Sequence, residues 1–190
     1  MKTATHRFTS ADLEKFPDLQ GVRYEIIDGD LYVSRQPSLA HQNALDEIQW
    51  TLRSWCKANG AGRAITVPGL VFAEDNDVVP DVVWISDARL LEASDERGHL
   101  RLAPELVVEV LSPGRANEVR DREIKLDLYS RQGVQEYWIV DWQRQVVHVF
   151  RRSSGALDPI ASLQGADVLT TPLLPGFKCA ISTLWEPQAS

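Results

Sequence analysis

The sequence predicts an α/β (α+β) domain in which a mixed β-sheet is flanked by helices. One observation is that short Val- and Ile-rich runs, bounded by Gly and Pro, alternate with segments whose apolar residues recur at helical spacing. The other is the length of 190 residues, which is enough for one domain with a proper core but short for two. We therefore expect residues 1–190 to form a single domain without internal repeats.

The first part of the chain is expected to form a short helix, a hairpin and a longer helix. Residues 9–20 begin as a capped helix, with Ser10 as the predicted N-cap and a proline as the stop. The Asp-Gly pair inside 24–33 lies between alternating runs, which is a strong signal for a tight hairpin turn. Apolar residues recur at helical spacing over 38–59, and Gly60 predicts the end of that helix.

The middle of the chain is expected to supply the core of the sheet. Apolar runs over 64–72 and 78–85 predict two strands separated by an acidic turn. Residues 87–102 are polar and predict a loop with one helical turn. Residues 105–111 predict a buried strand, because the run is short, rich in Val and has a proline near each end.

The last part of the chain alternates once more between helix and strand. Residues 117–132 predict a helix that ends at a glycine, and 135–140 with 145–150 predict a second hairpin. The remaining residues contain three prolines, which favours short edge strands.

Composition and charge exclude several classes of protein. The net charge of −7 argues against general charge-driven binding of nucleic acid, but not against an enzyme that contacts nucleic acid locally. There is no run of about 20 apolar residues and no hydrophobic segment after the N-terminus, so we expect no membrane span, no secretory signal and a cytoplasmic location. Cys56 and Cys179 stand in unlike contexts, which favours reduced thiols over a zinc site.

Glu109 is the most informative residue, because it is the only charged residue within Leu106–Leu111. A carboxylate in a buried strand loses hydration, which is costly unless a cation or hydrogen bonds replace the water. An arginine partner would suffice, and a metal ion is the simplest alternative. Asp81 stands at the start of another predicted core strand, where an Asp is ordinarily a turn or capping residue. Two acids on adjacent strands can nonetheless share a hard cation such as Mg²⁺, with Mn²⁺ as a substitute.

Lys125 is a second unusual residue, because it lies close to the apolar stripe of the predicted helix 117–132. Its side chain could extend past the core to water, or its ammonium could lie near a metal-bound water or a phosphate. Asp121, one turn earlier, could orient Lys125 or simply be exposed. A basic cluster in this region could be a solvated helix face or a phosphate contact, and its members are Arg115, Arg120, Arg122, Lys125 and Arg131.

Two further residues are weaker candidates. Glu25 precedes the turn of the first hairpin at a position that alternation makes half-buried, and taken alone it would be structural. His41, near the start of the long helix, could be an auxiliary polar group of a site or an exposed residue.

The order of these residues resembles the PD-(D/E)xK nuclease superfamily, which has an early acid, then Pro-Asp, then Glu inside a hydrophobic strand, then Lys. More narrowly, the chain resembles the Uma family of bacterial endonuclease-like proteins, which have a restriction-endonuclease-like fold. The segments that carry this resemblance are 24–31, 103–113, 133–141 and the helix with Asp121, Lys125 and Tyr129. The resemblance covers Phe8 to Arg151 and implies a core over about 8–151, with C-terminal strands over 152–190.

The resemblance also implies a role for each residue. Asp81 and Glu109 would be metal ligands, together with the Val110 carbonyl. Glu25 would be the helper acid, which holds a metal-coordinated water or a second ion. Lys125 would be the basic member of the site and would position the attacking hydroxide.

One departure from the superfamily pattern is Leu111, which stands where the pattern has its lysine, two residues after the strand acid. Lys125 would then have to reach the same point in space from the following helix. This substitution leaves open whether a nuclease of this fold has kept its activity.

Three hypotheses follow for the function. The first is Mg²⁺-dependent hydrolysis of phosphodiester bonds, in DNA rather than RNA, by a homodimer, since enzymes of this superfamily often pair subunits to cut both strands. The second is a fold retained for binding DNA or protein with an eroded metal site, which the net acidity and Leu111 favour. The third is an assembly role in which the aromatic residues of the second hairpin supply a dimer surface.

Overall fold

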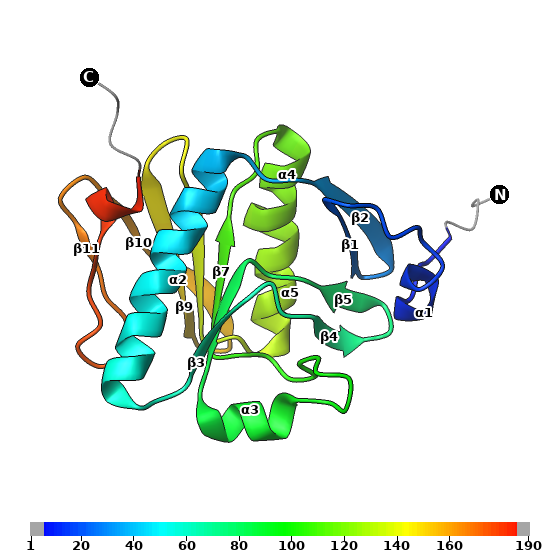
Figure 1. The fold of residues 1–190 in the computed structure, drawn as a ribbon, viewed down its shortest axis with the longest axis horizontal. Helices are drawn as coiled ribbons and strands as arrows, with labels where there is room; N and C mark the ends of the chain where they lie inside the picture. The colour runs from blue at the N-terminus through cyan, green and yellow to red at the C-terminus, as the bar shows by residue number, and fades with distance from the viewer. Residues whose placement is uncertain (1–5, 186–190) are drawn as a thin grey trace.

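The computed structural model describes residues 6–185, which fold around a six-stranded mixed sheet of order β10-β9-β8-β7-β6-β3 (Figure 1). β7 and β8 pair in parallel, and every other neighbouring pair in this sheet is antiparallel. The strands are β3 (Arg63–Thr66), β6 (Val82–Ile85), β7 (Leu106–Val110), β8 (Glu136–Asp141), β9 (Val146–Ser153) and β10 (Ala156–Gln164). This arrangement, with helices beside the sheet, confirms the predicted fold class.

Helices cover both faces of the sheet, as Figure 1 shows. One face carries α2 (Leu39–Asn59), and the other carries a helix of three consecutive parts: α4 (Arg115–Val119), the π-helical turn η1 (Arg120–Ile124) and α5 (Lys125–Gln132). Because side chains alternate along a strand, Val108 packs in the α2 core while Val107 packs with the α5 residues. Odd-numbered residues of β7 therefore face α5.

A second, four-stranded sheet of order β2-β1-β5-β4 stands beside the main sheet. Its strands are β1 (Val22–Ile27), β2 (Asp30–Arg35), β4 (Leu70–Ala73) and β5 (Asn76–Val78). The predicted Asp-Gly turn joins β1 to β2, with positive φ at both Asp28 and Gly29. Arg131 Nη2 lies 2.7 Å from Asp28 Oδ2, so the hairpin tip is tied to α5. This contact holds β1 close to the main sheet.

The predictions of continuous strands over 64–72 and 78–85 are wrong. Val67, with φ of +52°, interrupts the first before Pro68-Gly69, so β3 and β4 belong to different sheets. Val79-Pro80-Asp81 interrupts the second in the same way between β5 and β6. Proline removes a backbone donor from the ladder and favours such breaks. The second break leaves Asp81 just before β6, free of regular secondary structure.

Several predicted boundaries also need correction. The cap of α1 (Ser10–Leu13) is Thr9 rather than Ser10, because the backbone and hydroxyl of Thr9 both contact the Asp12 carboxylate. Residues 87–102 contain a true helix, α3 (Asp87–Ala93). The helix predicted over 117–132 begins two residues earlier, at Arg115.

The C-terminal strands differ in length from the prediction. β10 is the edge strand of the main sheet and has 9 residues, so it is not short. β11 (Val168–Leu169) and β12 (Cys179–Ala180) are short and form a separate pair, followed by the 3-10 turn η2 (Ile181–Leu184). Tyr137 and Trp138 are fully buried, which corrects the hypothesis that they supply a dimer surface.

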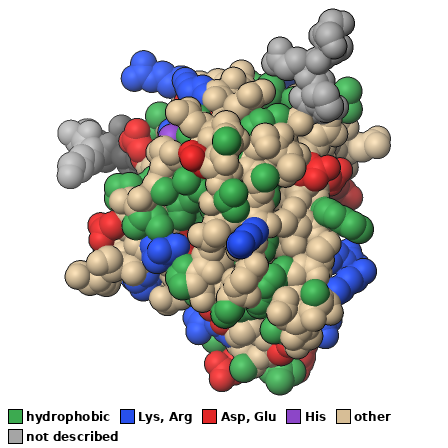
Figure 2. Space-filling view, turned by 90° about the vertical axis from the view of Figure 1, so that its left-hand side faces the viewer, with side chains coloured by type: hydrophobic (Ala, Val, Ile, Leu, Met, Phe, Trp, Pro, Cys, Tyr) green, Lys and Arg blue, Asp and Glu red, His purple; other side chains and the backbone are tan. Residues whose placement is uncertain are grey.

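The outer side of α2 and the C-terminal strands presents hydrophobic side chains scattered among uncharged ones, with most charged residues toward the margins (Figure 2). Trp50 of α2 and Val168 of β11 are among the large hydrophobic residues that are exposed. Cys56 and Cys179 are both buried free thiols. Within residues 6–185, no helix combines the length and apolar character needed to cross a bilayer.

Candidate active site

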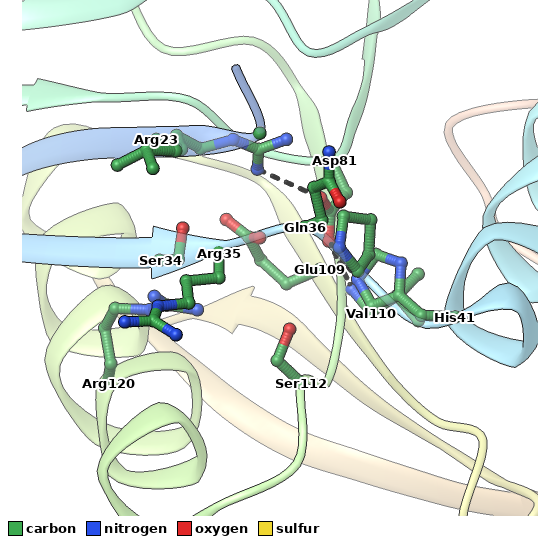
Figure 3. Close-up of a pocket in the computed structure, with 13 residues that line it drawn as sticks. Arg23, Ser34, Arg35, Gln36, His41, Asp81, Glu109, Val110, Ser112 and Arg120 are labelled. Atoms are coloured by element: carbon green, nitrogen blue, oxygen red, sulfur yellow. Dashed lines mark hydrogen bonds and ion pairs between the residues drawn. The ribbon is translucent and has the colours of Figure 1, made fainter. Parts of the chain in front are cut away.

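A pocket of about 170 Å³ opens where β7 ends, between the start of α2, the first hairpin and the π-helical turn (Figure 3). Its lining combines two carboxylates with several basic side chains. The ones that matter most here are Arg23, Arg35, His41, Asp81, Glu109 and Arg120. The pocket is therefore the place where most of the predicted site residues meet.

Strand register brings Asp81 and Glu109 together. In the antiparallel pair of β6 and β7, Val82 lies opposite Val108, so the next position outward sets Asp81 beside Glu109. Glu109 contacts α5 through Lys125 and Tyr129, whereas Asp81, just before β6, contacts His41 of α2 and Arg23 of β1. The two acids nevertheless line the same pocket, which the hypothesis of a shared cation requires.

Glu109 is 2% exposed and receives its hydrogen bonds on one oxygen. Lys125 Nζ and the Tyr129 hydroxyl donate to Oε1 at 2.9 and 2.8 Å. Within the described residues, Oε2 receives no hydrogen bond or ion pair. Burial, which Lys125 only partly offsets, raises the pKa of Glu109 to about 8, and the neighbouring Asp81 carboxylate adds to the rise.

Lys125 joins two carboxylates that come from different sheets. It is 1% exposed, and its Nζ lies 2.8 Å from Glu25 Oε1 as well as 2.9 Å from Glu109 Oε1. Burial alone would lower its pKa, but the charges of Glu109 and Glu25 outweigh that effect and raise it. The lysine reaches the strand acid from the following helix, while Leu111 is buried in the α5 core.

The π-helical turn explains how one helix presents two cations to the hairpin. The Lys125 amide donates to the Arg120 carbonyl, an i→i+5 bond that puts both residues on the same side of the helix. Arg120 Nη1 lies 3.9 Å from Glu25 Oε2, so this acid faces both cations. Asp121 is buried and forms its ion pair with Arg120 at 2.8 Å, so it is neither exposed nor paired with Lys125, the two alternatives that the sequence left open.

Asp81 is held by three donors from three elements. Val110 N donates to Oδ2 at 2.9 Å, and His41 Nε2 lies 3.5 Å from that same oxygen. Arg23 Nη1 donates to Oδ1 at 3.2 Å (Figure 3). Burial would raise the pKa of Asp81, but the hydrogen bond and charge of His41 and the charge of Arg23 lower it to about 2.

His41 is buried rather than exposed, since α2 begins at the pocket and turns the ring inward. Among the described residues its Nδ1 atom has no hydrogen-bond partner. Sequence reasoning therefore selected the correct neighbourhood for this residue, and its chemical role stays a prediction.

Three residues of the site were missed from the sequence: Arg23, Arg35 and Tyr129. Tyr129 stands one helical turn after Lys125, so a partner shared between the two was detectable from the i, i+4 spacing. Arg23 stands two residues before Glu25 and therefore on the same face of β1. Neither spacing says which carboxylate the residue contacts, which depends on how the hairpin packs.

The donor set of the pocket fits a hard divalent cation. Asp81 and Glu109 offer carboxylate oxygens, the ligands that Mg²⁺ and Mn²⁺ prefer. Glu109 Oε2 has no partner among the described residues and is free to accept a further interaction. No cluster of three or more His, Cys, Asp or Glu side chains within residues 6–185 is placed to hold a metal. Backbone oxygens such as the Val110 carbonyl, or water, would complete the coordination.

Comparisons with known proteins bear on the fold and the family. A crystal structure of a "putative nuclease belonging to DUF820" from Anabaena variabilis ATCC 29413 is similar, with a TM-score of 0.74 and 20% sequence identity. The match covers 93% of this chain and 97% of that one. No curated protein matches. A family model, Uma2, described as "Putative restriction endonuclease", matches residues 10–182. The chain therefore belongs to the Uma2 family and has the fold of its nuclease-like relative.

Proposed function

We propose that this protein is a metal-dependent endonuclease that hydrolyses phosphodiester bonds of DNA. The observation that carries the proposal is the position of Lys125 Nζ, within 2.9 Å of both Glu25 and Glu109, while Glu109 lines the same pocket as Asp81. A fixed, buried ammonium next to two acids, one of which lines the pocket, combines a cation site with a charge that stabilises an oxyanion. Family membership supports nuclease chemistry, while the metal and the DNA substrate belong to the proposal.

Each residue would contribute a separate function. Asp81 and Glu109 would hold Mg²⁺, which offsets phosphate charge and makes water more acidic. Lys125 would orient the attacking water through its ammonium and stabilise the negative charge that develops on the phosphate. Glu25 would keep Lys125 charged and aimed at the pocket, and a water held by Glu25 would complete its role as helper acid.

Arg35 would contact the phosphate backbone of the substrate. It lines the pocket and is exposed, and its side chain has no hydrogen bond or ion pair with any other described residue. Arg23 and Arg120, the other arginines of the pocket, are already engaged by Asp81 and by Asp121 with Glu25. A free guanidinium beside the acids compensates locally for the net charge of −7.

The test is cleavage of plasmid, linear duplex, single-stranded DNA and RNA with Mg²⁺, Mn²⁺ or no divalent ion. We expect cleavage of DNA that depends on the cation. Asp81→Asn keeps the shape of the side chain but removes its charge, so it should reduce the rate at least about 100-fold. Asp46→Asn, an exposed position on α2, is the matched control and should cleave normally.

The outcomes separate the nuclease from a binding module. Cleavage that survives Asp81→Asn would assign the activity to another site or to a contaminant. DNA binding without cleavage and without Mn²⁺ binding would instead favour the eroded module. Calorimetric titration with Mn²⁺ measures metal binding directly, without depending on cleavage.

A homodimer remains part of the proposal, because cutting both strands of a duplex is simplest with two copies of the site. The exposed hydrophobic residues on the outer side of α2 and β11 are compatible with an interface there (Figure 2). Light scattering after size-exclusion chromatography, with and without DNA, decides between one and two copies.

A further inference from the structure

Of the groups that contact Asp81, Arg23 is the one that another cation could replace most easily. Its Nη1 atom donates to Asp81 Oδ1 at 3.2 Å and to the Val79 carbonyl at 3.1 Å. Its side chain is 30% exposed, whereas that of Asp81 is 5% exposed. The guanidinium therefore borders the pocket, and one of its two contacts is to backbone.

The two oxygens of Asp81 differ in what holds them. Oδ2 receives the Val110 amide and lies near His41, two groups fixed by β7 and α2. Oδ1 receives only the Arg23 guanidinium within the described part of the chain. Glu109 has the same asymmetry, with Oε1 engaged by Lys125 and Oε2 without a partner there.

The two less restrained oxygens, Asp81 Oδ1 and Glu109 Oε2, are thus the natural ligands for a divalent cation. Arg23 already supplies positive charge to the first of them. An ion that binds both carboxylates must replace Arg23 at Oδ1, because two cations cannot share one buried oxygen without strong repulsion.

We infer that Arg23 occupies the cation position at Asp81 in the metal-free site and passes to the substrate phosphate when a divalent ion binds. This inference rests on the proposed function. The Val79 carbonyl remains as an anchor, so the guanidinium turns within the pocket instead of leaving it. An arginine freed in this way matches phosphate well, because its planar fork can donate two parallel hydrogen bonds.

The consequence is a reciprocal coupling between cation and nucleic acid. The cation frees a guanidinium for the phosphate, so it raises the affinity for DNA. By linkage, DNA raises the affinity for the cation by the same factor. Without the ion, Arg23 stays bound to Asp81 and cannot donate to phosphate.

The test measures Mn²⁺ binding without DNA, by electron paramagnetic resonance of free Mn²⁺, in wild type, Arg23→Gln and Arg35→Gln. Arg35→Gln removes the same charge from the same pocket without touching Asp81. We expect the Kd for Mn²⁺ to fall at least about tenfold in Arg23→Gln and to change less than about threefold in Arg35→Gln.

A second measurement follows the binding of a fluorescent DNA duplex with Ca²⁺ or with chelator. Ca²⁺ should tighten DNA binding by the wild type and have little effect on Arg23→Gln. Arg23→Lys keeps the charge but lacks the fork, so its Mn²⁺ affinity should stay within about threefold of wild type while the coupling to DNA is lost. This variant decides the question if Arg23→Gln does not fold.

The possible failures are distinguishable. Unchanged or weaker Mn²⁺ binding by Arg23→Gln, with normal binding by the wild type, would overturn the inference and leave the proposed nuclease intact. The same holds for Arg23→Lys if it keeps full coupling to DNA. A wild-type protein that binds no Mn²⁺ would overturn both the inference and the proposed function.

Discussion

Replacing Lys125 by Met should destabilise the protein in a pH-dependent way. The substitution keeps most of the side-chain volume but removes the ammonium that joins Glu25 and Glu109. Breaking a buried ion pair by removing one partner costs about 3–5 kcal/mol, because it leaves uncompensated buried charge. We expect the free energy of unfolding to fall by that amount at pH 9.

The loss should be smaller at pH 6, because Glu109 can then keep a proton. Burial raises the pKa of Glu109 to about 8 in the folded wild type, and removing Lys125 raises it further. An acid with a raised folded-state pKa stabilises the protein most below its unfolded pKa, and this stability is lost as pH rises through the folded value. The wild type and Lys125→Met lose this stability alike between pH 6 and pH 8. Above pH 8 only the wild type keeps an ionised Glu109 next to an ammonium, so the additional loss in the variant amounts to about 1 kcal/mol at pH 9.

Urea denaturation at pH 6 and pH 9 measures both quantities. Lys125→Met/Glu109→Gln is the control, because it leaves no bare charge at position 109 and should recover much of the stability at pH 9. An equal loss at the two pH values, or a loss below about 1 kcal/mol, would refute the reasoning from buried charge.

Three further predictions concern the same region and one glycine. Mn²⁺ affinity should rise between pH 6 and pH 8 and then level off, because Glu109 must lose its proton to bind the ion; a pH-independent affinity by calorimetry would contradict this. Tyr129→Phe removes a hydrogen bond to Glu109 and should lower the free energy of unfolding by about 1–3 kcal/mol in urea; an unchanged midpoint would count against that bond. Gly62→Ala should lower the melting temperature more than Gly60→Ala. Both glycines have positive φ, but only at Gly62 would a Cβ lie 2.7 Å from the Ile85 carbonyl. Equal effects on the melting temperature would exclude the steric cause.

The parts of the site that lie close in sequence were predictable from it. Glu109 is the one charge in an apolar run, and Lys125 lies at helical spacing with buried residues, so both were expected near the core. The contact of Lys125 with Glu109 follows from a strand and the next helix packing together. A strand and the helix that follows it can pack together in few ways, which limits the possible partners of Lys125.

Contacts that depend on how the two sheets meet were not predictable. Glu25 is buried because the first hairpin packs against the π-helical turn, and no local pattern encodes that packing. Likewise, the predicted strands ran through Pro68 and Pro80, and nothing local in the sequence says that the chain crosses between sheets at each of these prolines. Arg23 reaches Asp81 only because of those crossings.

The positions of Arg120 and Lys125 depend on the number of residues in the π-helical turn as well as on their identity. Removing one residue from Arg120–Ile124 would restore ordinary α-helical geometry and swing everything upstream by about 100°. Lys125 would keep its orientation toward the sheet, whereas Arg120 would lose its contact with Glu25. A single deletion would then dissociate the two cations while every side chain in the pocket kept its chemical identity.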